Sequence, residues 1–170
     1  MFKRKHHLVG LFVLFLITGC ATTIKGPVFH PVGNVPENKS LVYIYWTDKA
    51  ARIKGIDFSI KANGESLTDM RHGGYYQYFS DPGTLELSSH VNFKFMAVGL
   101  LDVAMAPTEK LEIDIDGGGT YYVRCISHGA NAFNYALTMM LVDKERGEYE
   151  IREAKLLPKN SSGTNAKIPE

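Results

Sequence analysis

The histidines, carboxylates and cysteines of this chain are the residues that could do chemistry, and their spacing limits what that chemistry can be. Beyond the first 20 residues, the histidines are His30, His72, His90 and His128. None belongs to an HxH, HxxxH or HExxH pattern, the spacings that bring two imidazoles to one metal ion. The sequence therefore predicts no metal site and no cofactor, and we expect these histidines at the surface or in turns.

Three carboxylates, Glu112, Asp114 and Asp116, alternate along one predicted strand and so share one of its faces. Such a row could bind calcium or act as a general acid and base, although a solvated outer strand face is the commoner reason for it. Residues 88–90 read Ser-Ser-His. Adjacency does not make a catalytic triad, because a nucleophile and its base meet in space. We therefore predict no catalytic residues and a protein that is not an enzyme.

The two cysteines, Cys20 and Cys125, are the remaining reactive groups. Cys125 shares a predicted strand face with Tyr121 and Val123, whereas His128 is roughly 10 Å further along the strand and on the opposite face. A reactive thiolate needs a nearby cation or imidazole that lowers its pKa. We therefore expect Cys125 to be a buried, inert thiol, and the chemistry of Cys20 depends on the segment before it.

The first 20 residues have the order of parts of an export signal. Residues 3–5 are Lys-Arg-Lys, residues 8–17 are apolar apart from one glycine, and the small residue Gly19 precedes Cys20. A helix needs roughly 20 residues to span a bilayer, so this short run predicts a cleaved signal peptide over residues 1–19 rather than a retained transmembrane helix.

Residues 17–20, Ile-Thr-Gly-Cys, resemble the lipobox of bacterial lipoprotein signal peptides. The resemblance implies that the Cys20 thiol receives a diacylglyceryl group, that cleavage follows before Cys20, and that the new amine is acylated. Two or three acyl chains anchor a protein stably, since each buried CH₂ contributes roughly 0.8 kcal/mol. The alternative is an ordinary secretory signal in which Cys20 is incidental. By resemblance to lipoprotein sorting in Gram-negative bacteria, Ala21 favours the periplasmic face of the outer membrane, with its outer face or the inner membrane as alternatives.

Composition bounds the class of protein that remains after cleavage. Residues 20–170 suit one domain, and a chain of this length buries enough surface to need no disulfide or metal. Loss of residues 3–5 leaves 16 of the 19 basic residues against 18 acidic ones. No basic stripe appears, so we predict no nucleic-acid partner. Pro27, Pro31 and Pro36 predict an extended tether over residues 20–39, although part of it could lie along the domain surface.

Residues 40–158 predict a mainly β domain. Residues 41–46 are apolar on both faces, which is typical of a central strand covered on both sides. Residues 56–62 alternate and lead into Asn63-Gly64, a strong hairpin signal. Further strand candidates cover residues 65–70, 75–79, 85–88, 91–95, 111–115, 121–125 and 137–142. We predict an antiparallel β-sandwich of about eight strands. A charged turn through Gly147, a short C-terminal helix within residues 149–157 and a disordered tail over residues 159–170 complete the prediction.

Several fold motifs occur in a fixed order along this domain: residues 41–45 (LVYIY), the Asn63-Gly64 hairpin, residues 76–83 ending in Pro-Gly, and residues 120–124 (TYYVR). Together they resemble a family of small bacterial envelope lipoproteins whose common domain is uncharacterised. The hairpin and the Pro-Gly turn are also similar to PEGA-type β-sandwich modules. The resemblance covers residues 40–157 and rests on turns and core strands, so it implies a fold and transfers no catalytic residue.

Two features indicate where a partner could bind. Residues 96–107 carry a single charge, and they form either a buried crossover or short helix, or an exposed apolar patch. The possible contact residues are Met96, Val98, Leu100, Leu101, Val103 and Met105. The second feature is an aromatic group that could form an exposed face for peptide or glycan, although core packing is its commoner use. It comprises Tyr43, Tyr45, Trp46, Tyr75, Tyr76 and Tyr78.

These observations predict a membrane-anchored periplasmic lipoprotein that acts as a non-enzymatic binding or scaffolding module of the bacterial envelope. Its expected partners are the membrane, through Cys20, and an envelope protein or a glycan. The alternative is a peptidoglycan- or glycan-binding or -active cell-wall protein that uses the aromatic face with Asp114 or Asp116. A third class is an accessory protein that adds a strand to a partner's sheet edge.

Overall fold

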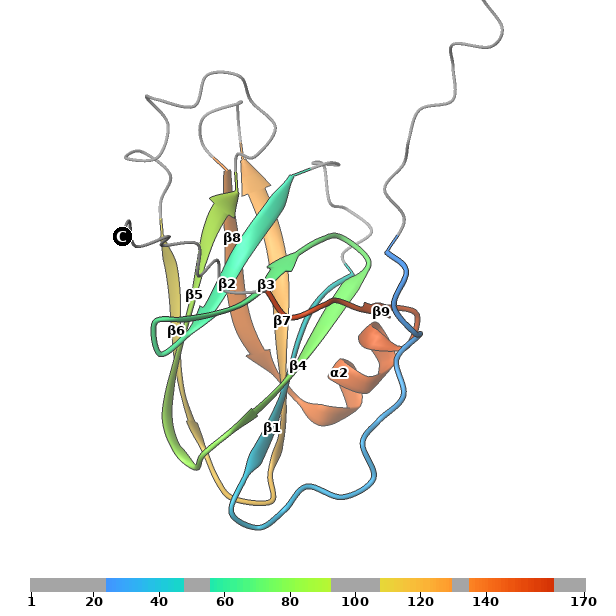
Figure 1. Cartoon of the computed structure of the whole chain (residues 1–170), viewed down its shortest axis with the longest axis vertical. Coiled ribbons are helices and arrows are strands. Elements are labelled where there is room, and N and C mark those ends of the chain that lie inside the picture. Colours follow the sequence, from blue (N-terminus) through green and yellow to red (C-terminus); the bar gives the residue numbers. More distant parts are fainter. Residues whose placement is uncertain (1–23, 48–55, 93–107, 130–134, 161–170) are drawn as a thin grey trace, which may run out of the picture.

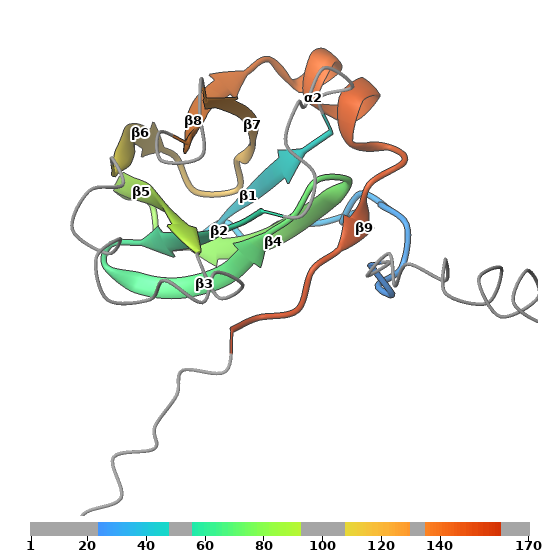
Figure 2. The same cartoon turned by 90° about the horizontal axis from the view of Figure 1, so that it is seen from above.

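The computed structural model describes residues 24–47, 56–92, 108–129 and 135–160. In these ranges the chain forms two sheets that face each other, with one short helix on the outer face of the larger sheet (Figures 1 and 2). The predicted mainly β sandwich is confirmed. No helix in the described ranges has the length and apolar content needed to cross a bilayer.

The larger sheet has five strands in the order β8-β7-β1-β4-β9, and the smaller has four in the order β3-β2-β5-β6. The larger sheet consists of β1 (Ser40–Trp46), β4 (Gly74–Ser80), β7 (Thr120–Gly129), β8 (Tyr135–Val142) and β9 (Lys155–Leu156). The smaller sheet consists of β2 (Asp57–Ala62), β3 (Glu65–Met70), β5 (Gly83–Asn92) and β6 (Glu109–Ile115). The predicted Asn63-Gly64 hairpin joins β2 to β3, and both residues have the positive φ that such a turn requires (47° and 83°).

Strand β1 is buried on both faces, as its sequence predicts. Val42, Ile44 and Trp46 point between the sheets, where they pack with residues of the smaller sheet such as Phe58 and Ile60. The alternate residues of β1 point outward into a second apolar cluster with β4, β7 and the helix. The larger sheet therefore has core on both sides and needs a cover on its outer face.

The pairing of β1 differs from the wholly antiparallel arrangement that the sequence predicts. β1 runs antiparallel to β4 but parallel to β7, with Leu41 beside Thr120. The chain leaves β6 in the smaller sheet, crosses at Gly118 (φ 74°) and enters β7 at the same end where β1 begins. The two strands therefore run in one direction, and this end is fixed by the Leu41 N–H, which donates to the Gly119 carbonyl at 2.9 Å.

Residues 24–36, which we call the N-terminal strap, lie along the outer face of the larger sheet. Phe29 is only 8% exposed, and its ring stands edge-on to the rings of Tyr43 and Tyr75 at 5.0 and 5.3 Å. The Phe29 N–H donates to the Ala154 carbonyl at 2.9 Å. Of the two arrangements that the sequence left open for this segment, the surface-bound one therefore holds from Ile24 onward.

The single helix in the described ranges, α2 (Lys144–Ile151), packs on the same face against β1 and β7. The predicted short C-terminal helix is present, but it begins at Lys144 and ends at Ile151 instead of lying within residues 149–157. The predicted turn through Gly147 is wrong. Gly147 is inside the helix because a close approach to β7 requires it there, and beyond Ile151 the chain turns back to form β9 beside β4.

Several predictions fall outside the described residues. These are the signal peptide with the lipid attachment residue Cys20, the apolar segment with its possible contact residues from Met96 to Met105, and the tail from residue 161. At the C-terminal limit, the Asn160 N–H donates to the Leu67 carbonyl at 2.8 Å, so the chain is still attached to β3 there.

Candidate functional site

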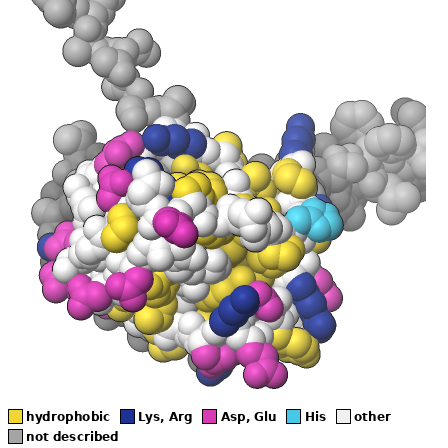
Figure 3. Space-filling view, turned by 90° about the horizontal axis from the view of Figure 1, so that it is seen from below, with side chains coloured by type: hydrophobic (Ala, Val, Ile, Leu, Met, Phe, Trp, Pro, Cys, Tyr) yellow, Lys and Arg dark blue, Asp and Glu magenta, His cyan; other side chains and the backbone are white. Residues whose placement is uncertain are grey.

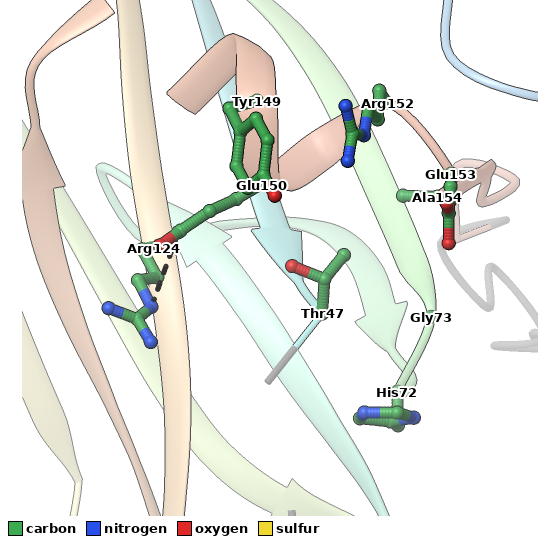
Figure 4. Close-up of a pocket in the computed structure, with 9 residues that line it drawn as sticks. All are labelled: Thr47, His72, Gly73, Arg124, Tyr149, Glu150, Arg152, Glu153 and Ala154. Atoms are coloured by element: carbon green, nitrogen blue, oxygen red, sulfur yellow. Dashed lines mark ion pairs between the residues drawn. The ribbon is translucent and has the colours of Figure 1, made fainter. Parts of the chain in front are cut away.

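A cavity of about 460 Å³ opens where the C-terminal end of α2, the β3–β4 turn and the end of β1 meet (Figure 4). It is lined by Thr47, His72, Gly73, Arg124, Tyr149, Glu150, Arg152, Glu153 and Ala154. Arg124 comes from β7, Thr47 follows β1, and the residues from 149 to 154 come from α2 and the turn after it. The cavity therefore joins segments from distant parts of the chain and depends on the complete fold.

The position of α2 is set at its first two turns. The Asp143 side chain caps the helix by accepting a hydrogen bond from the Arg146 N–H at 2.8 Å. One turn later, a Cβ on Gly147 would lie 2.3 Å from Cγ of Tyr122, so only glycine lets the helix axis come this close to β7. This close packing carries Glu148 and Glu150 to within reach of tyrosine hydroxyls on the sheet.

Glu150 is the centre of a polar network at the inner wall of the cavity. Its Oε2 accepts a hydrogen bond from the Tyr45 hydroxyl at 2.9 Å and lies 3.4 Å from Nε of Arg124. Its Oε1 accepts from Nε of Arg146 at 2.9 Å. The side chains of Arg124 and Glu150 are 19% and 20% exposed, so this ion pair is partly screened from water. Both charges are therefore held in fixed positions before any ligand arrives.

The network also fixes protonation states. Burial, followed by the hydrogen bond to Glu150, raises the pKa of Tyr45 well above its ordinary value. Burial, followed by the charge of Glu148, likewise raises the pKa of Tyr122. The hydrogen bond to Glu150 raises the pKa of Arg146. The two phenols therefore stay neutral donors and the guanidinium stays charged across the whole physiological range.

The outer rim of the cavity has a different character. Tyr149 is 65% exposed, and the guanidinium of Arg152 lies over its ring, 4.1 Å from the centroid. His72 lies on the opposite side of the opening in Figure 4, and its ring is edge-on to the buried indole of Trp46 at 5.5 Å. The rim thus offers aromatic surface and charges of both signs, with Glu153 beside Arg152. This chemistry suits recognition of a polar ligand or side chain that carries charge and apolar surface.

The carboxylates that the sequence singled out lie elsewhere. Glu112 and Asp114 are exposed on β6, the edge strand of the smaller sheet, and Asp116 is exposed directly after the end of that strand. Asp114 accepts a hydrogen bond from the Thr84 hydroxyl at 2.9 Å, and Glu112 faces Glu86 across the pair of strands. The interpretation as a solvated strand face is confirmed.

The serines and histidines do not assemble into a nucleophile and base. Ser89 is 1% exposed, and its hydroxyl donates to the Leu137 carbonyl at 2.8 Å. His90 instead contacts Thr108, with Nδ1 and Oγ1 3.1 Å apart, and burial lowers the pKa of its imidazole. His128 hydrogen-bonds to Thr138 on β8, and His30 is exposed on the strap. Of the predicted histidines, only His72 lines the cavity.

Cys125 is fully buried in the core between the sheets, and burial raises the pKa of its thiol. The prediction of an inert, buried thiol is confirmed. Its strand neighbours Tyr121 and Val123 pack against the same core.

The aromatic group predicted as a possible exposed face is buried instead. Five of its six members are between 0% and 9% exposed: Tyr43, Tyr45, Trp46, Tyr75 and Tyr76. They are covered because β1 has core on both sides and because the strap and α2 close its outer face. The prediction that these rings form an exposed face for a glycan is therefore wrong. The structure shows that they pack in the core.

Sequence reasoning missed the residues that build the cavity. Arg124 was predicted only as part of a strand, and the residues up to Gly147 were predicted as a charged turn. The signal was the spacing of opposite charges, since Arg146 and Glu150, and also Lys144 and Glu148, are four residues apart. Such pairs are typical of one helix face.

Comparison of the chain with family models, with curated proteins and with solved structures gives no match. The resemblance to small envelope lipoproteins and to PEGA-type modules therefore stays a prediction from the sequence motifs.

Proposed function

We propose that this chain is a lipid-anchored protein of the bacterial envelope whose β-sandwich is a non-enzymatic binding or scaffolding module. The anchor follows from the export signal and from Cys20 at its end. The binding site is the cavity between α2, β7 and the β3–β4 turn. The apolar segment of residues 96–107 is a second possible contact region.

The observation that carries a binding role is the fixed ion pair at the inner wall of the cavity. Arg124 and Glu150 neutralise each other, and Tyr45 and Arg146 occupy the remaining positions on the carboxylate. A general base or nucleophile must be able to change its bonding during a reaction. A carboxylate held by two hydrogen-bond donors and an ion pair is suited instead to stay in place and present a constant charge pattern to a ligand.

Photo-crosslinking in cells tests the proposed binding site. A photoreactive residue at Tyr149, on the rim, should give a discrete adduct in cells that express the full-length protein. The same residue at Glu112, on the exposed β6 edge, is the matched control and should give none. Arg152→Glu, which reverses a rim charge without touching the buried pair, should reduce the Tyr149 adduct several-fold.

Enzyme assays test whether the protein catalyses a reaction instead. Turnover of hydrolase substrates by the purified protein, abolished by Glu150→Gln, would contradict a non-enzymatic role. A Tyr149 adduct unchanged by Arg152→Glu would contradict the assignment of this cavity as the binding site.

A further inference from the structure

The chain between the lipid attachment residue and the folded domain is very short. The strap is already packed on the domain at Ile24, and Gly26 lies so close to β9 that a Cβ there would sit 1.9 Å from the Leu156 carbonyl oxygen. Only residues 21–23 separate Ile24 from Cys20. Four Cα–Cα steps of extended chain reach at most about 14 Å.

This reach limits how far the domain can stand from a bilayer. The acyl chains of a lipidated Cys20 begin at the hydrocarbon boundary, and each headgroup layer is about 6 Å thick. Crossing that layer uses nearly half of the available chain, so Ile24 has roughly 8 Å of remaining freedom above the headgroup surface. The extended tether that the sequence predicts over residues 20–39 is therefore reduced to the few residues before Ile24.

The strap and β9 form one edge of the molecule, which we call the strap edge. Val28 bridges Lys155, and the Leu156 N–H donates to the Pro27 carbonyl at 2.8 Å. Figures 1 and 2 both place this edge opposite β6. An anchor that leaves from Ile24 therefore brings the strap edge toward the membrane and turns β6 away from it.

The distribution of charge agrees with this orientation. On the strap edge, Lys25 and His30 are exposed, Val28 is 45% exposed, and Lys155 is half-buried. Glu153, two residues before Lys155, is an exposed carboxylate near this edge.

The opposite edge carries Glu109, Glu112 and Asp114 of β6 against one lysine, Lys110. Figure 3 shows acidic side chains along the left of the view, with a further group at its lower edge. Basic residues are attracted to an anionic lipid surface, and acidic residues are repelled by it.

We propose that the strap edge rests on phospholipid headgroups and that the short chain from Cys20 holds it there. The proposal rests on lipid anchoring in the proposed function. With this edge on the membrane, the β6 edge of the smaller sheet faces the aqueous compartment.

Depth-dependent fluorescence quenching tests this orientation. The full-length chain is expressed in bacteria, and the mature protein is reconstituted in phosphatidylethanolamine–phosphatidylglycerol vesicles that contain a headgroup-nitroxide lipid. A fluorophore is placed at Val28→Cys or, as the matched control, at Glu112→Cys. Buried Cys125 stays unlabelled, and the thiol of an acylated Cys20 is blocked. We expect quenching several-fold greater at position 28 than at position 112.

Insertion of about ten Gly/Ser residues after Thr23 adds a reach of roughly 17 Å and should bring quenching at position 28 down toward that at position 112. Undiminished quenching after insertion would overturn the role of the short chain. Equal quenching at the two positions in protein of confirmed acylated mass would overturn the orientation alone. Absence of acyl mass on Cys20 would refute the anchor and, with it, this proposal.

Discussion

At the scale of single residues, Glu150 organises the cavity because two hydrogen-bond donors and one ion-pair partner from different elements converge on its carboxylate. Tyr45 comes from β1, Arg124 from β7 and Arg146 from α2. Each partner is placed by its own element, so the charge pattern of the inner wall depends on how α2 is seated on the sheet.

Replacing Tyr45 by phenylalanine isolates one of these contacts. The variant keeps the buried ring but loses the hydroxyl that donates to Glu150, and hydrogen bonds to charged groups contribute about 1.5–3 kcal/mol. Because Glu150 keeps two other partners, we expect the free energy of unfolding to fall by about 1–2 kcal/mol. Urea denaturation measures this. Tyr149→Phe, at an exposed ring, is the control and should leave the midpoint nearly unchanged; a loss of equal size in both variants would contradict the network.

At the scale of elements, α2 depends on one glycine. Helix propensity alone favours alanine over glycine by about 1 kcal/mol. A Cβ at position 147, however, would meet the Tyr122 ring at 2.3 Å, and overpacking of this kind costs about 1–3 kcal/mol or more. Because the contact is fully buried, we expect the steric cost to exceed the gain in helix propensity.

We therefore expect Gly147→Ala to destabilise the protein by about 1–2 kcal/mol and to lift α2 from β7. Thermal unfolding and the near-ultraviolet circular dichroism of the tyrosines report the two effects. Glu145→Ala, on the exposed face of the same helix, is the control without a clash, and it should be nearly neutral because its small gain in helix propensity is offset by the loss of a first-turn carboxylate. A stabilised Gly147→Ala protein would show that the helix is not closely seated.

The same elements show what a sequence can reveal. Alternation of apolar residues predicts strands, the Asn63-Gly64 pair predicts a hairpin, and a run apolar on both faces predicts the buried β1. Gly147 was misread because a glycine required by a tertiary contact looks the same as a glycine required by a turn. The cavity was missed because Arg124 and Glu150 meet only through the seating of α2, which no local pattern encodes.

At the scale of the whole molecule, the strap works as part of the core. Phe29 fills the space between the Tyr43 and Tyr75 rings, although its sequence context of prolines and glycines suggests a linker. The outer apolar cluster is therefore completed by residues that come before the predicted domain boundary at Ser40. A truncation that begins at Ser40 would remove one wall of that cluster.

Phe29→Ala tests this role. Truncation of a buried phenylalanine costs about 3–5 kcal/mol, and here it also frees the strap and uncovers two tyrosines. We expect a large fall in the urea midpoint, together with faster proteolysis within residues 24–36. Val28→Ala removes a half-exposed neighbour and is the control, with an expected loss below about 1 kcal/mol. Equal protease resistance in both variants would mean that the strap does not depend on Phe29.

The parallel pairing of β1 with β7 has a consequence for the order of events during biogenesis. A chain that emerges from its N-terminus first presents β1, a strand that is buried on both faces, long before β7 exists to lie beside it. Contacts between such distant segments form slowly. Until they form, an apolar strand whose edges are unpaired is prone to aggregate. An exported chain of this topology needs its early half kept apart from other chains until residues 120–124 have arrived.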